Sequence, residues 1–208
     1  AQSVKKGVKQ SGGTPREFCT ITVTDGIAMG HEGMKSSLIS REVIADSAEL
    51  TVRGHCYDAL VGIAGCDKSL PGLMMSMLRL NVPSVFIYGG SILPGKFKGK
   101  DVTVVDVFEA VGKHSSGKMS SEELRELELV ACPSAGACGG QFTANTMACV
   151  SEAIGLALPY SAGTPAPYEE RDKYAYESGQ AVMNLLEKKI KPREIVTKKS
   201  LENAATIV

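Results

Sequence analysis

Two short apolar segments with a helical segment between them constrain the fold more than any other feature. Residues Ala59–Ala64 and Val82–Tyr88 are rich in aliphatic and aromatic side chains, and Pro71–Leu80 has helical spacing with a proline in its first turn. A strand, a helix and a strand this close together form a βαβ unit, whose strands run parallel. We therefore predict an α/β fold with three α/β/α layers around a mainly parallel sheet.

The turn Gly65–Gly72, between the first strand and the helix, carries three reactive groups in a row. These are the thiol of Cys66, the carboxylate of Asp67 and the amine of Lys68. The turn follows the carboxyl end of a strand, where open α/β sheets build their sites. Thiolate sulfur suits iron–sulfur clusters or zinc, and carboxylate oxygen suits magnesium or manganese, so the pair indicates two metals of different softness. The alternative is an ordinary surface turn with an Asp67–Lys68 ion pair.

A second candidate carboxylate lies earlier in the chain. The β-branched run Phe18–Thr24 predicts a strand that ends at Asp25, and a glycine-punctuated loop follows as far as Met34. A carboxylate that ends a strand and opens such a loop is a site candidate, although an Asx-turn is an equally good interpretation. Strand ends at Asp25, Cys66 and Gly89 would open on the same edge of a parallel sheet, which strengthens the prediction of a site.

A third segment places another thiol before a helix. The small-residue loop Cys132–Gly140 precedes a predicted helix over Thr143–Leu156, and Cys138 lies just before its first turn. Backbone N–H groups and the helix dipole stabilise a thiolate there, so Cys138 is a candidate metal ligand or nucleophile. For Cys132 and Cys149 a purely structural role is favoured.

Charge and composition argue against several kinds of partner. The 208 residues include 23 Lys and Arg against 23 Asp and Glu, so there is no basic field for nucleic acid, and a small-molecule partner is favoured. The apolar stretches are too short to span a bilayer, so no membrane partner is expected. The six cysteines show no paired Cys-x-x-Cys spacing, which favours reduced thiols in a cytosol-like compartment over disulfides.

The remaining pattern is helical, and it is cut at both ends. Helices are predicted over residues 40–53, 105–112, 121–130 and 171–189. Residues 1–10 and the segments from residue 192 onward also have helical character, and the chain has no initiator Met. We therefore expect residues 1–208 to form a single α/β domain, truncated at both ends, of a longer protein.

Three segments in this order resemble one enzyme family. They are Asp25-Gly26-Ile27-Ala28-Met29-Gly30-His31, Gly65-Cys66-Asp67-Lys68-Ser69-Leu70-Pro71-Gly72 and Gly136-Ala137-Cys138-Gly139-Gly140-Gln141-Phe142-Thr143-Ala144-Asn145-Thr146-Met147. With them the chain resembles the amino-terminal domain of the dihydroxy-acid/6-phosphogluconate dehydratase family, which includes several sugar-acid dehydratases. The resemblance covers the whole chain and implies that a carboxyl-terminal domain is absent from it.

The resemblance implies a role for five residues. By position, Cys66 and Cys138 match ligands of an iron–sulfur cluster, expected to be [2Fe-2S], and Asp25 and Asp67 match Mg²⁺ ligands. Lys68 matches a lysine that is carbamylated and binds Mg²⁺ through its carbamate. The family's third cluster cysteine lies in an Asn-Pro-Cys-Asn motif upstream of this sequence. A glutamate ligand and the serine thought to act as base belong to the missing carboxyl-terminal part, so no catalytic base is expected here.

The chemistry of such a site is consistent with these ligands. Three thiolates on a two-iron cluster leave one iron open, and that iron can bind a hydroxyl group as a Lewis acid. Mg²⁺ prefers octahedral oxygen coordination, and carbamylation turns a cationic amine into an anionic oxygen ligand. An unmodified ammonium group at Lys68 would repel the ion.

The resemblance further implies a hydro-lyase that converts 2,3-dihydroxy-3-methyl acids to 2-keto acids in valine and isoleucine biosynthesis. It implies a homodimer, cytoplasmic in bacteria and plastid or mitochondrial in eukaryotes, and residues 1–208 alone should be inactive. A sugar-acid or 6-phosphogluconate dehydratase is the alternative within the family. Ser69–Gly72 and Gly139–Phe142 are more similar to the branched-chain enzyme.

Two alternatives belong to other classes. Cys138 would be the nucleophile of a hydrolase or acyltransferase if one of the three histidines, His31, His55 or His114, acts as its base. The chain would otherwise be a non-catalytic zinc or iron–sulfur binding module. Both are weaker interpretations than the dehydratase.

Overall fold

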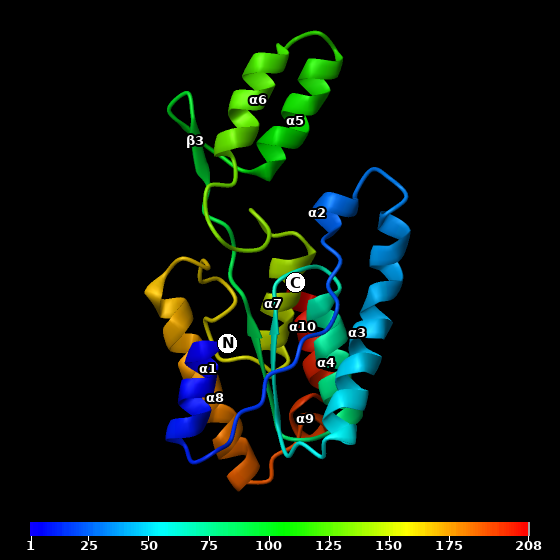
Figure 1. Ribbon diagram of the computed structural model, residues 1–208, viewed down its shortest axis with the longest axis vertical. Coiled ribbons are helices and arrows are strands. Elements are labelled where there is room, and N and C mark those ends of the chain that lie inside the picture. The colour runs from blue at the N-terminus through cyan, green and yellow to red at the C-terminus, as the bar shows by residue number, and fades with distance from the viewer. Residues whose placement is uncertain (208) are drawn as a thin grey trace.

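The computed structural model describes residues 1–207, and Figure 1 shows their arrangement. The helices are α1 (Gln2–Gln10), α2 (Asp25–Ala28), α3 (Met34–Gly54), α4 (Ser69–Leu80), α5 (Val104–Ser115), α6 (Ser121–Val130), α7 (Thr143–Ala153), α8 (Glu169–Glu187), α9 (Pro192–Ile195) and α10 (Lys198–Ile207). The strands are β1 (Leu60–Ala64), β2 (Ser84–Tyr88), β3 (Gly95–Phe97) and β4 (Lys100–Val102). None of the described helices is both long and apolar enough to cross a membrane.

The predicted βαβ unit is present. Strands β1 and β2 pair in parallel, with Leu60 opposite Ser84 and Ala64 opposite Tyr88, and α4 connects them. Every residue of β2 is buried, which explains why this strand reads as an unbroken apolar run rather than an alternating one. The structure confirms a mixed α/β fold with a small parallel sheet. The wider three-layer arrangement stays a prediction.

Helices pack against both faces of this sheet. Phe86 and Tyr88 point into a core formed with residues of α3, α4 and α7. Val85 and Ile87, which alternate with them, point into a second core with residues of α1 and α8. The sheet is therefore held between two groups of helices, visible on either side of it in Figure 1.

A separate lobe projects from one end of the molecule. The segment that follows β2 contains β3, which forms an antiparallel hairpin with β4. This hairpin, α5 and α6 surround a small core of their own, set apart from the sheet in Figure 1. Thr103 begins α5 through a capping box with Asp106.

The strand predicted for Phe18–Thr24 is wrong. The segment is extended but pairs with no strand among residues 1–207, and it leads into the short helix α2 where a loop was expected. Residues of this segment and of β1 line a cavity of about 710 Å³. β-Branched side chains favour extended backbone, but a strand also needs a hydrogen-bonding neighbour, and the cavity separates this segment from β1.

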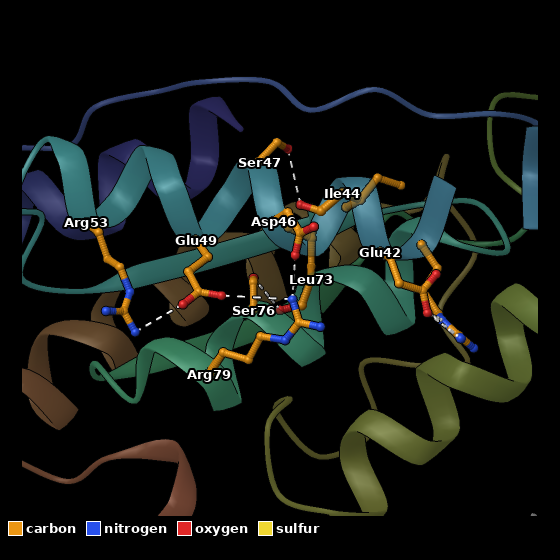
Figure 2. Close-up of polar contacts among 10 residues, drawn as sticks. Glu42, Ile44, Asp46, Ser47, Glu49, Arg53, Leu73, Ser76 and Arg79 are labelled. Atoms are coloured by element: carbon orange, nitrogen blue, oxygen red, sulfur yellow. Dashed lines mark hydrogen bonds and ion pairs between the residues drawn. The ribbon is translucent and has the colours of Figure 1, made fainter. Parts of the chain in front are cut away.

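Close contact between α3 and α4 fixes the turn that precedes α4. A Cβ atom at Gly72 would lie 2.8 Å from the carbonyl oxygen of Arg41, so only glycine allows the two helices to approach this closely. Figure 2 shows the ion pairs across the same contact, where Arg79 Nη1 lies 2.7 Å from Asp46 and 3.9 Å from Glu49. Helix α3 begins at Met34, six residues before the predicted start at residue 40, because its first turns pack beside α2.

Candidate metal centre

The ammonium group of Lys68 lies between two carboxylates from different parts of the chain. Its Nζ is 2.7 Å from Asp25 Oδ2 and 3.2 Å from Asp67 Oδ2. The side chains are nearly buried, with exposed fractions of 16% for Lys68, 8% for Asp25 and 15% for Asp67. Asp25 is the first residue of α2, whereas the other two lie in the turn before α4. The three predicted magnesium ligands therefore meet at one point.

A serine that the sequence did not single out supports this group. The hydroxyl of Ser37, on the inward face of α3, donates a hydrogen bond to Asp25 Oδ1, and Ser37 is fully buried. A polar residue at a core-facing position of a helix is the signal that would have found it. The partner of Ser37, however, is decided only when α2 packs beside α3.

The site shifts the pKa values of these three groups in different directions. Burial alone would raise the pKa of Asp25, but hydrogen bonds with Asp67, Lys68 and Ser37 outweigh it and hold this pKa below its ordinary value. The pKa of Asp67 is raised by burial and by the neighbouring Asp25 carboxylate. Burial lowers the pKa of Lys68, yet its bonds to both carboxylates raise it overall. With both carboxylates ionised the group carries one excess negative charge, which favours a further cation.

Cys66 lies in the same turn as Asp67 and Lys68. The Ser69 hydroxyl donates to the carbonyl oxygen of Cys66 at 2.7 Å and accepts from its backbone N–H at 3.2 Å. These bonds close the turn directly before α4 begins. The thiol is half-buried, so it is accessible to a ligand while its backbone is held in place.

Cys138 lies ahead of α7, as predicted, but burial of its thiol opposes the effect of the helix amino terminus that the sequence indicated. Burial raises the pKa of this thiol above its ordinary value, against the backbone N–H groups of Ala144 and Asn145, which lower it. The helix amino terminus thus acts on the sulfur as expected. Burial outweighs it in the free thiol, because desolvation disfavours the charged form.

Backbone contacts explain the small residues around Cys138. Gly136 has a φ of +137°, and a Cβ atom there would lie 2.6 Å from the backbone of Ser91. The Ala137 N–H donates to the Gly90 carbonyl at 2.9 Å, and the Ile92 N–H donates to the Cys138 carbonyl at 3.2 Å. The loop is therefore packed directly on the segment that follows β2.

The turn that carries Cys66 lies next to the loop that carries Cys138. A Cβ atom at Gly65 would lie 3.5 Å from the Cβ atom of Ala137, so the residues that precede the two cysteines are neighbours. Cys132 is exposed, and Cys149 is half-buried within α7. The structure thus places the Cys66–Lys68 turn beside the Cys138 loop, and Lys68 joins this turn to Asp25. Asp25 reaches this place from α2 rather than from the end of a sheet strand, and the ligand role of the five residues stays a prediction.

The donor set fits the two expected groups in different ways. Within residues 1–207 no three His, Cys, Asp or Glu side chains gather closely enough to hold a metal ion. Asp25 and Asp67 already share a cation in the ammonium group of Lys68, so a carbamate at Lys68 would complete three anionic oxygen ligands for Mg²⁺. Two half-buried thiols fit part of an iron–sulfur ligand set and leave the rest to other segments.

These features define a class: an α/β protein with carboxylates and thiols gathered in the turns beside a parallel strand pair. Residues 1–208 match the family description "Dihydroxy-acid/6-phosphogluconate dehydratase N-terminal" over their full length. The chain therefore belongs to the dihydroxy-acid/6-phosphogluconate dehydratase family and corresponds to its amino-terminal part.

Individual relatives agree with this assignment. The chain is 90% identical over 208 residues to a dihydroxy-acid dehydratase of Pelagibacter ubique and 82% identical over 208 residues to one of Parvibaculum lavamentivorans. It is 57% identical over 205 residues to a dihydroxy-acid dehydratase of the more distant Sulfurisphaera tokodaii. All or nearly all of this chain is covered in each case, but it spans only 36% to 37% of the length of these relatives.

Proposed function

We propose that the full-length protein containing this chain is a hydro-lyase that dehydrates 2,3-dihydroxy-3-methyl acids to 2-keto acids, the reaction used in valine and isoleucine biosynthesis. The observation that carries this proposal is the meeting of Asp25, Asp67 and Lys68 beside two thiols, in a chain whose relatives are named dihydroxy-acid dehydratase. The overall change removes the C2 proton and the 3-hydroxyl as water, and the resulting enol becomes the ketone.

Five residues of this chain would hold the cofactors. Asp25, Asp67 and a carbamylated Lys68 would bind Mg²⁺, and Cys66 and Cys138 would supply two of the ligands of a [2Fe-2S] cluster. When bound, these groups supply Lewis acidity toward the carboxylate and 2-hydroxyl of the substrate and toward the departing 3-hydroxyl. Carbamylation joins CO₂ to the neutral amine of Lys68 and releases one proton.

The protein's own contribution is to orient these ligands before they bind. Ser37 fixes one oxygen of Asp25 and leaves the other directed at Lys68. His31 braces the loop after α2, because its Nε2 lies 2.7 Å from the Ile27 carbonyl and its Nδ1 accepts from the Gly33 N–H at 3.0 Å. Ligands held in this way do not have to reorganise when a metal arrives.

The remaining parts of the reaction are assigned to segments outside this chain. We propose that the third cysteine, a glutamate ligand and the base serine come from those segments, and that the full-length protein is a homodimer. Residues 1–208 alone would then be inactive. The substrate is a small dihydroxy acid, and a sugar acid or 6-phosphogluconate is the alternative substrate within the family.

The nucleophile alternative has no support in the contacts of residues 1–207. His31, His55 and His114 form hydrogen bonds with Ile27 and Gly33, with Thr51 and with Ser121 respectively, and none of these bonds involves Cys138. A cysteine nucleophile needs a base within hydrogen-bond reach, so the ligand role is favoured for Cys138.

The decisive experiment measures iron, acid-labile sulfide, zinc and the visible spectrum of the anaerobically purified full-length protein. Cys66→Ser and Cys138→Ser should each lose iron and sulfide together, whereas Cys132→Ser, which changes an exposed thiol, should retain both. Dehydration assays with branched-chain and sugar acids then decide the substrate. Iron and sulfide that persist in both ligand variants would refute the assignment, and zinc without sulfide would indicate a binding module.

A further inference from the structure

A buried arginine stands behind the cysteine loop without an acidic partner. Arg171, in the first turns of α8, is only 7% exposed, and among residues 1–207 its side chain forms hydrogen bonds to carbonyl oxygens and no salt bridge. Its Nη1 donates to the Tyr88 carbonyl at 2.8 Å, and its Nη2 donates to the carbonyls of Ser161, at 2.6 Å, and Thr164. Its Nε has no partner among the described atoms. All of its hydrogen bonds go to carbonyl groups, and burial of a cation without an ion pair is costly.

Tyr88 connects this arginine to the cysteine loop. It is the last residue of β2 and is 1% exposed. The Arg171 guanidinium lies 5.8 Å from the centre of its ring, and the Tyr88 hydroxyl donates to the Ala137 carbonyl at 2.5 Å. Contacts therefore run without a break from α8, through the end of β2, to the residue before Cys138.

The backbone of Cys138 needs external support. Its φ is +57°, a left-handed conformation that is strained for a non-glycine residue. Three hydrogen bonds hold this part of the loop: those of the Ala137 N–H, the Cys138 carbonyl and the Ala137 carbonyl. Only the third has a side-chain donor, namely Tyr88, so it is the one that a substitution can remove cleanly.

We propose that Tyr88, held in place by Arg171, is a positioning residue that fixes the Cys138 loop in the conformation that presents the thiol to an iron–sulfur cluster. The cluster part of this inference rests on the proposed function, whereas the positioning part concerns the protein alone. Buried polar contacts of this kind are high in cost and specific in geometry, as expected for groups that orient a ligand.

The test compares two variants of the full-length protein that each lose one tyrosine hydroxyl. Tyr88→Phe removes the bond to Ala137, and Tyr160→Phe changes a side chain that is 82% exposed and whose hydroxyl forms no hydrogen bond within the described residues. In the cluster-loaded protein, Tyr88→Phe should release iron to a chelator about two to ten times faster, the factor that one neutral hydrogen bond represents. The electron paramagnetic resonance g-values of its reduced cluster should also shift. Tyr160→Phe should match the wild type in both.

Alkylation of the apoprotein tests the positioning role without any cluster. Peptide mass spectrometry measures the rate at which iodoacetamide labels Cys138. This rate should be several-fold higher in Tyr88→Phe than in Tyr160→Phe, because a loosened loop exposes the thiol. Equal rates would overturn the inference whatever the iron content. A wild-type protein without iron would refute the proposed function instead, and the alkylation rates would still decide the role of Tyr88.

The role of Arg171 is tested by a matched pair of substitutions. Arg171→Met should increase the alkylation rate of Cys138 as Tyr88→Phe does. Arg171→Lys should increase it less, because an ammonium group can still donate to the Tyr88 carbonyl. If Arg171→Met lowers the melting temperature but leaves the alkylation rate of Cys138 unchanged, Arg171 is only structural and its part of the inference is wrong. Arg171→Lys retains a buried donor and keeps the test interpretable if the methionine variant fails to fold.

Discussion

Replacement of Ser37 by alanine should loosen the carboxylate side of the metal centre. The Ser37 hydroxyl donates to an ionised acceptor, Asp25, in a fully buried position. A hydrogen bond to a charged group contributes about 1.5–3 kcal/mol, and its loss also leaves the carboxylate without one of its donors. We therefore expect Ser37→Ala to destabilise the packing of α2 on α3.

Ser40→Ala is the matched control. Ser40 is 1% exposed on the same helix, and its hydroxyl donates to the neutral Ser37 carbonyl at 2.7 Å, a bond that contributes about 0.5–1.5 kcal/mol. Both substitutions gain the same helix propensity, about 0.5 kcal/mol, which cancels in the comparison. The difference between the two variants should be about 1–2 kcal/mol, or a factor of roughly five to thirty in the local opening constant.

Hydrogen exchange followed by peptide mass spectrometry measures this opening constant in the full-length protein. Peptides that cover residues 24–37 should exchange about five to thirty times faster in Ser37→Ala than in Ser40→Ala at neutral pH. Peptides from the distant lobe of α5 and α6 should exchange alike in both. Equal exchange of residues 24–37 in the two variants would show that the Ser37–Asp25 bond does not hold the site.

Three further substitutions, and one control in α5, test packing and charge by thermal unfolding. Gly72→Ala should destabilise the protein by about 1–3 kcal/mol despite the better helix propensity of alanine, because the new Cβ atom meets the Arg41 carbonyl. The control Gly112→Ala, with open space around it, should stabilise the protein by up to about 1 kcal/mol. A stabilising Gly72→Ala would contradict the close contact. Arg79→Ala, which removes the ion pairs that Arg79 forms in Figure 2, should lower the stability by at most about 1 kcal/mol, and by less at high salt, because the side chain is 39% exposed. A larger effect that persists at high salt would be inconsistent with surface pairing. Lys68→Met should destabilise the apoprotein by about 3–5 kcal/mol, since it leaves two nearly buried carboxylates without their cation. Millimolar Mg²⁺ should recover part of this lost stability. An unchanged melting temperature would refute the shared-cation arrangement.

Local patterns in the sequence were sufficient for much of this protein. The parallel pairing of β1 with β2 follows from two apolar runs separated by one helix, and α6 begins at Ser121, as its capping serine and early glutamates predict. The candidate ligands could also be identified from the sequence, because short motifs place Cys66, Asp67 and Cys138 beside strand and helix ends. These features depend on residues within a few positions of one another.

Other features depended on contacts between distant segments. Phe18–Thr24 has strand propensity but no partner strand in the described fold, so the prediction failed. At Cys138 the helix amino terminus was visible in the sequence, but the degree of burial that outweighs it was not. Burial depends on how much of the chain covers a side chain, and no local window reports that quantity.

The βαβ unit, most helix positions and the candidate ligands could be predicted from the sequence, because periodicity, capping and turn chemistry act over short distances. Which groups meet depended on the packing of the whole chain: Lys68 meets Asp25, 43 positions away, Tyr88 meets Ala137, 49 positions away, and Arg171 meets Tyr88, 83 positions away. These pairings arise when helices and loops pack around one sheet, and a buried polar group must then find its partner wherever the fold places one.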